Sequence, residues 1–125
     1  SWDGRDVYYT KRGSSTSIWR VPAGGGEETE VLPVPGSPGR ALAVFRSGLY
    51  YLRKAKGQYS WQDALGESEY MINFLDFESG QVTTLFKEEG FIPWADLAVS
   101  PDEEWILYGK YPVPVSELML MENFR

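Results

Sequence analysis

The chain of 125 residues is long enough for one domain with a single hydrophobic core. Its net charge of -6 argues against direct contact with nucleic acid, which needs a basic surface. The chain contains no Cys and no His, which excludes disulfides and removes the commonest general base and zinc ligand. No apolar run approaches the roughly 20 residues of a membrane-spanning helix. Five Trp, eight Tyr and six Phe favour half-buried strands, so we expect an all-β fold.

The first expected unit covers residues 1–35. A turn at its start precedes a run of β-branched and aromatic residues, and glycines at 24–26 provide a later turn. Three prolines and two glycines at 33–39 end the unit, because proline cannot donate to a strand ladder. The expected strands are 7–11, 18–21 and 29–32.

The second expected unit covers residues 41–88 and repeats this order. A polar insertion at 53–70 interrupts it, and a turn at 78–81 precedes the last strand. The expected strands are 41–45, 49–52, 71–77 and 82–86.

The third expected unit covers residues 91–125. Residues 97–108, LAVSPDEEWILY, contain two apolar runs joined by a proline-led acidic turn, which is the clearest hairpin signal in the chain. The expected strands are 97–99, 105–108 and 118–121.

The spacing of the units predicts a repeat protein. Val7 and Leu49 are 42 residues apart, and Leu49 and Ile106 are 57 apart, an excess close to the size of the insertion. Periods of about 40 to 50 residues with four short strands are typical of propeller blades. We therefore expect a partial β-propeller of about three four-stranded blades. The first blade lacks its innermost strand and the last blade its outermost one, and a β-sandwich of ten strands is the alternative.

The units resemble the TolB-type, WD-like propeller repeat, in which a Ser-Pro-Asp-Gly turn precedes an apolar strand. The best copy is 100–108, residues 1–9 form another, and 18–27 match the Gly-Gly turn that follows the next strand. The second unit departs from the pattern, with Phe-Arg-Ser-Gly at 45–48. The resemblance implies the fold more specifically than the function, because such propellers serve many tasks.

The ending at 118–125 is similar to the C-terminus of large acidobacterial proteins that carry a winged-helix or protein kinase domain before a propeller. This resemblance implies that the chain is the last part of a longer bacterial protein. An incomplete propeller exposes strand edges and apolar faces. We therefore expect self-association through the open blade edges, in which two copies of three blades form one six-bladed ring or strand edges pair between molecules.

Three groups of residues are candidates for chemistry. The carboxylates at 102–104 are of the kind that hard cations prefer, but no EF-hand spacing surrounds them, and we expect a solvated turn. The glycines at 24–26 lack the helix and Lys of a phosphate loop. Tyr59, Trp61 and Asp63 lie in the insertion, where a binding surface is expected, although Trp61 covering a blade edge is the structural alternative.

We expect a non-catalytic module that binds a protein or peptide, or acts as a scaffold, without a cofactor. No serine has a histidine base available, and nothing singles out a pair of carboxylates for glycoside hydrolysis. Two alternatives remain open at this stage. The first is a ligand-sensing propeller of a transcriptional regulator or kinase, and the second is the propeller part of a hydrolase.

Overall fold

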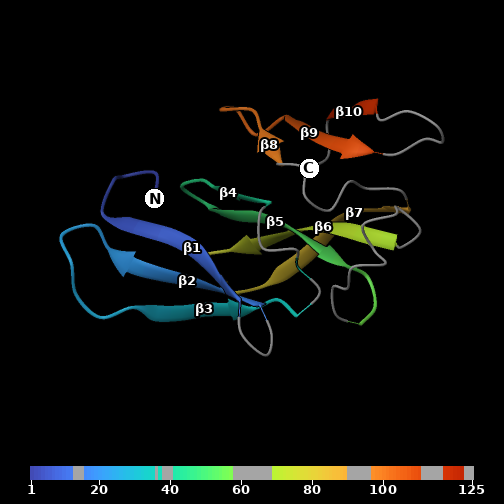
Figure 1. Ribbon diagram of the computed structural model, residues 1–125. Helices are drawn as coiled ribbons and strands as arrows, with labels where there is room; N and C mark the ends of the chain where they lie inside the picture. Colours follow the sequence, from blue (N-terminus) through green and yellow to red (C-terminus); the bar gives the residue numbers. More distant parts are fainter. Residues whose placement is uncertain are drawn as a thin grey trace.

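The computed structural model describes residues 1–12, 16–35, 37, 41–57, 69–89, 97–110 and 117–122. These residues form ten β-strands and no helix (Figure 1). The all-β prediction is confirmed, and every strand expected from the sequence is present with small shifts at its ends.

The strands form three small antiparallel sheets, each in chain order, and none of the sheets closes on itself. The first sheet contains β1 (Asp6–Arg12), β2 (Thr16–Pro22) and β3 (Thr29–Pro33). The middle sheet contains β4 (Leu42–Val44), β5 (Gly48–Lys54), β6 (Glu69–Asp76) and β7 (Val82–Glu89). The last sheet contains β8 (Ala98–Val99), β9 (Trp105–Lys110) and β10 (Glu117–Glu122).

The middle sheet lies between the other two, and both of its faces are buried. Successive residues of a strand point to opposite faces, so β5 directs Leu49 and Tyr51 toward the first sheet and Tyr50 and Leu52 toward the last. One cluster contains Ile18, Val34, Leu49, Tyr51 and Leu75. The other contains Ala41, Tyr50, Leu52, Tyr70, Ile72, Phe74, Leu97, Ile106 and Tyr108.

The first and middle sheets share an irregularity at the same position. The register between β2 and β3 shifts after Ile18, and the register between β6 and β7 shifts after Ile72. A β-bulge adds one residue to one strand and increases the local twist. Its recurrence makes Ile18 and Ile72 equivalent positions of a structural repeat.

The strand registers extend this equivalence to all three sheets. Val7, Leu49 and Ile106 each occupy the second position of the strand that follows the turn, and their partners on the next strand are Val21, Leu75 and Met121. The alignment expected from the sequence spacing of Val7, Leu49 and Ile106 agrees with this register.

The two sheet-to-sheet contacts use equivalent positions. The first sheet contacts the middle one through Tyr8, Ile18 and Leu32, and the middle sheet contacts the last through the equivalent residues Tyr50, Ile72 and Phe86. The opposing residues are equivalent as well, because Leu49 and Leu75 correspond to Ile106 and Met121. The same interface is therefore built twice.

The turns at 1–5 and 100–104 have the same hydrogen bonds. The Ser1 hydroxyl donates to Asp3 Oδ1 at 2.8 Å, and the Ser100 hydroxyl donates to Asp102 Oδ1 at 2.6 Å. In both turns a backbone N–H two residues after the aspartate also donates to that oxygen, at 3.1 Å. The Ser100 hydroxyl is the main cause that lowers the pKa of Asp102. This carboxylate is thus engaged within its turn, as expected for a structural repeat element.

The middle sheet has a shorter turn between its first two strands. The Phe45 N–H donates to the carbonyl of Gly48 at 2.8 Å, which leaves two residues, Arg46 and Ser47, at the tip. Gly48 itself belongs to β5, and a Cβ there would lie 2.7 Å from Phe74 Cζ and would collide with the Leu75 carbonyl oxygen. The departure seen in the sequence at 45–48 therefore reflects a turn of different length.

Candidate functional site

The turns that lead into β1, β5, β7 and β9 all lie at one end of the stacked sheets, near the N-terminus in Figure 1. Antiparallel pairing places alternate turns of each sheet at one end, and the stacking of the three sheets brings these ends together. We call the side chains of Trp2, Arg46, Phe77 and Glu103 on these turns the rim surface. The rim surface spans all three sheets. Two adjoining grooves lie along it, and Arg46 and Phe77 line both of them.

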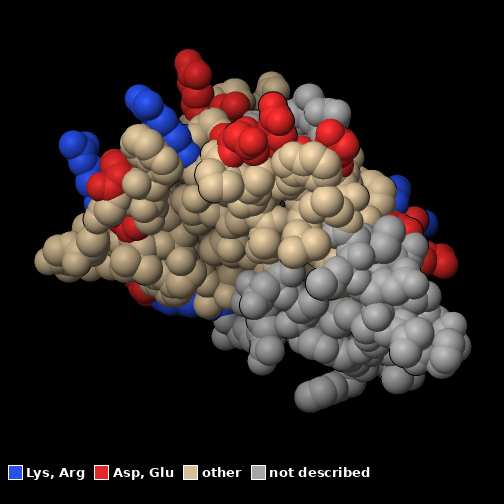
Figure 2. All heavy atoms as spheres, turned by 90° about the horizontal axis from the view of Figure 1, so that it is seen from above, with Lys and Arg blue, Asp and Glu red and all other residues tan. Residues whose placement is uncertain are grey.

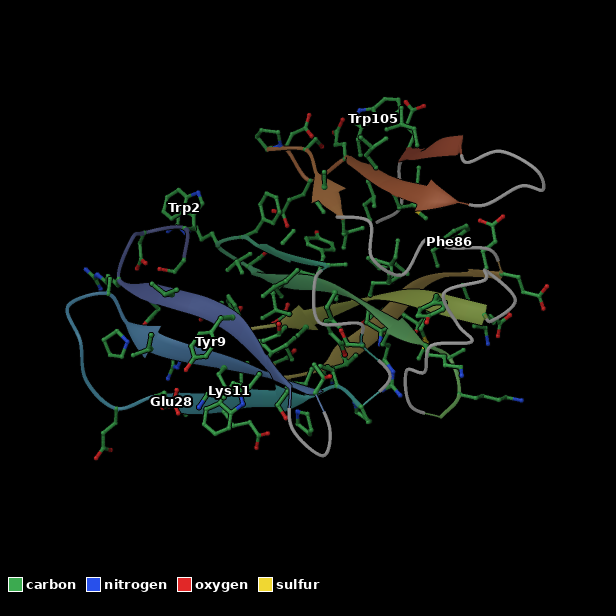
Figure 3. All side chains as sticks on the ribbon, in the orientation of Figure 1. Trp2, Tyr9, Lys11, Glu28, Phe86 and Trp105 are labelled. Atoms are coloured by element: carbon green, nitrogen blue, oxygen red, sulfur yellow. The ribbon has the colours of Figure 1, made fainter. Side chains whose placement is uncertain are left out.

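The first groove, of about 290 Å³, lies between the first and middle sheets. Trp2 is 64% exposed, and the Arg46 guanidinium carbon lies 5.2 Å from the centroid of its ring. Figure 3 shows Trp2 standing away from the sheets at the end where β1 begins. A guanidinium over an indole face is a favourable cation–π pair, so these two side chains hold each other at the mouth of the groove.

The wall of the first groove is a stacked aromatic pair. The rings of Tyr8 and Phe77 have centroids 5.6 Å apart and are inclined by 21°. Tyr8 comes from β1 and Phe77 from the turn between β6 and β7, so the stack also links the two sheets. Phe77 remains partly exposed at the top of the stack. The groove thus combines a flat aromatic wall with a charged lining of Asp3, Arg5, Asp6 and Arg46.

The second groove, of about 570 Å³, extends from Arg46 toward the last sheet. Its lining contains three carboxylates, those of Asp76, Glu78 and Glu103. Asp76 Oδ1 accepts backbone hydrogen bonds from Ser79 at 2.8 Å and Glu78 at 2.9 Å. The Ser79 N–H is the main cause that lowers the pKa of Asp76. Asp76 is therefore an ionised turn acceptor, and the groove is acidic beside Arg46.

A second charged group lies away from the rim, on the outer side of the first sheet. Glu28 accepts hydrogen bonds from the Tyr9 hydroxyl and the Lys11 ammonium (Figure 3). The Lys11 nitrogen also lies 4.2 Å from the centroid of the Trp19 ring. Lys11 is the main cause that lowers the pKa of Glu28. This arrangement is an ion pair on an exposed strand face.

Tyr59, Trp61 and Asp63, the residues that the sequence singles out for binding, lie outside the described residues. Sequence reasoning assigns Trp2, Arg46 and Phe77 only to turns or a strand end and misses them as a group. The signal available for Arg46 is the departure of its turn from the repeat pattern. Their proximity arises from the stacking of two sheets, which the sequence pattern does not specify.

No family model matches the chain, and no curated protein matches its sequence. In the described part of the chain, no three acidic side chains approach closely enough to hold a metal ion. Within the same part, no helix has the length and apolar character needed to cross a membrane.

Proposed function

We propose that this chain is a non-catalytic protein-binding or peptide-binding module, built as a segment of a β-propeller with TolB-like repeats. The repeated stacking of the sheets supports the propeller, because blades of a propeller contact their neighbours through equivalent faces. The equivalence of the two interfaces described above is the regularity that such an architecture requires.

The exposed pair of Trp2 and Arg46 is the observation that carries the binding function. Trp and Arg, with Tyr, are the residues that most often dominate the free energy of protein–protein binding. Here they border a groove whose wall is the Tyr8 and Phe77 stack, and carboxylates continue the surface beyond Arg46. This combination fits an extended peptide with an apolar side chain for the first groove and a basic one for the second.

Selection of peptides from a display library on the wild-type chain tests the proposal. The affinity of enriched peptides is then measured for the wild type and for Trp2→Ala and Arg46→Ala. We expect each substitution to weaken binding by about tenfold or more, the loss typical of a central interface residue. Lys56→Ala is the matched control, because Lys56 is an exposed cation in the turn after β5 at the opposite end of the sheets.

The thermal midpoint of each variant shows whether the fold is intact. Failure to enrich any peptide would count against the binding function. Peptides whose affinity survives both rim substitutions but is lost in Tyr59→Ala and Trp61→Ala would move the site to the insertion instead.

A further inference from the structure

Among the described residues, the two outer sheets each leave one face uncovered. On the first sheet the uncovered face includes Val7, which is 50% exposed. On the last sheet it includes Leu107 and Leu120, which are 38% and 58% exposed. Single exposed aliphatic side chains are common on protein surfaces, so it is the positions of these residues in the repeat that indicate a partner.

The equivalent positions in the middle sheet are buried. Val7 corresponds to Leu49, which is 0% exposed because it packs on the first sheet. Leu107 and Leu120 correspond to Tyr50 and Phe74, which are 0% and 7% exposed because they pack on the last sheet. The free faces are therefore the two halves of an interface that the chain already forms twice.

These two halves are complementary to each other rather than to themselves. In both existing contacts, the face that carries the residue equivalent to Leu107 packs on the face that carries the residue equivalent to Val7. The free face of the last sheet is thus of the kind that packs on the free face of the first sheet. Continuation of the stack requires the last sheet of one molecule to meet the first sheet of another.

We infer that two copies of this chain associate head to tail, with the last sheet of each copy covering the first sheet of the other. Two such contacts related by a twofold rotation close a ring of six sheets and leave no face of this kind uncovered. Figure 2, seen from the side of β8 to β10, shows a broad uncharged surface beside a group of carboxylates. This interaction is separate from the rim surface and goes beyond the proposed function.

Two aromatic residues on the free face of the first sheet have equivalents in the buried interface, and the Lys11–Glu28 ion pair lies beside them on the same face. Tyr9 and Trp19 occupy the positions of Tyr51 and Asn73 in the middle sheet. There the Asn73 side-chain amide donates to the Tyr51 hydroxyl at 3.3 Å within a buried interface. The existing interface therefore already contains a hydrogen-bonded polar pair at this point of the face.

Sedimentation equilibrium over a wide concentration range tests the inference on the wild type and two variants. Val7→Glu places a charge on the free face of the first sheet, and Leu120→Glu places one on the free face of the last sheet. We expect the wild type to reach the mass of two copies of the 14.2 kDa chain and each variant to remain a monomer. Gln81→Glu, in the exposed turn before β7, makes the same charge change away from both faces and should associate as the wild type does.

Mixing the two variants distinguishes a head-to-tail contact from a symmetric one. In a mixed pair, one contact contains both substitutions and the other contains neither, so the intact contact restores association. We expect heterodimers to form from the two monomeric variants, with weaker affinity than the wild type.

A wild type that stays monomeric at all concentrations overturns the inference. A Val7→Glu variant that still dimerises, or a mixture of the two folded variants that remains monomeric, also overturns it. Growth into open assemblies larger than two copies overturns the closed ring. Far-ultraviolet circular dichroism of each variant establishes that the monomers are folded.

Discussion

The Tyr50 hydroxyl donates a 2.8 Å hydrogen bond to Glu103 Oε1, which links the buried face of the middle sheet to the acidic turn of the last sheet. Glu103 has a φ of 59°, in the left-handed region that residues with a Cβ rarely adopt. The equivalent residue in the first turn is Gly4, with a φ of 73°. The glutamate thus occupies a glycine position and contributes a contact that glycine lacks.

We expect the effect of Glu103→Gly to depend on Tyr50. The substitution relieves the backbone strain in both backgrounds, but only in the wild type does it also remove the acceptor of the Tyr50 hydroxyl. The change in the free energy of unfolding caused by Glu103→Gly should therefore be more favourable by about 1 kcal/mol in the Tyr50→Phe background than in the wild type. Chemical denaturation of the wild type, the two single variants and the double variant measures this difference. Equal changes in the two backgrounds would show that the hydrogen bond contributes nothing.

Gly48→Ala should destabilise the protein by about 1–3 kcal/mol, as overpacking of a tight site does. The added methyl group would meet the Leu75 carbonyl oxygen and the Phe74 ring, and a backbone atom within a sheet cannot move aside. Gly24→Ala is the control, because a Cβ at Gly24 would have no neighbour within 4 Å. Thermal denaturation that finds the two substitutions equally tolerated would contradict this account of Gly48.

Ile72→Ala should lower the free energy of unfolding by about 2–5 kcal/mol, the usual cost of a cavity in a packed core. Ile72 is 0% exposed and belongs to the cluster between the middle and last sheets. Thr83→Ala, at an exposed position of β7, should change it by less than about 0.5 kcal/mol. Denaturant titration checks both values, and a small loss for Ile72→Ala would mean that these sheets do not pack tightly.

Alkaline pH should destabilise the fold partly through Tyr108. Burial, followed by the charge of Glu88, raises the pKa of the Tyr108 phenol to about 12. Since the phenol of an unfolded chain ionises near pH 10, the unfolded state loses this proton first, and stability falls as the pH rises from about 10 to 12. Below pH 10 this contribution is fully present.

The Tyr108→Phe variant isolates that contribution. Its free energy of unfolding should decline less steeply between pH 10 and 12 than that of the wild type. Ultraviolet absorbance should also show one fewer phenol ionising near pH 12. Identical pH profiles for the two proteins would assign the loss of stability at alkaline pH to other groups, such as Tyr9 and Tyr51, whose pKa values are also raised.

Local patterns in the sequence are sufficient to predict the ten strands and their antiparallel order. Alternation of apolar residues, β-branched and aromatic runs, and turn residues act over a few neighbouring positions, so they are visible without knowledge of the fold. The shared role of the turns at 1–5 and 100–104 is equally local, because the Ser and Asp side chains accept hydrogen bonds from backbone N–H groups at most five residues away.

Contacts between sheets were decided only by the tertiary structure. The sequence shows that Leu49 and Tyr50 point to opposite faces, but not which sheet each face meets, because apolar burial is not directional. The grouping of Trp2, Arg46 and Phe77 depends on that stacking. The repeat was therefore determined by the sequence, whereas the candidate site and the two complementary free faces arose from how the repeated sheets pack.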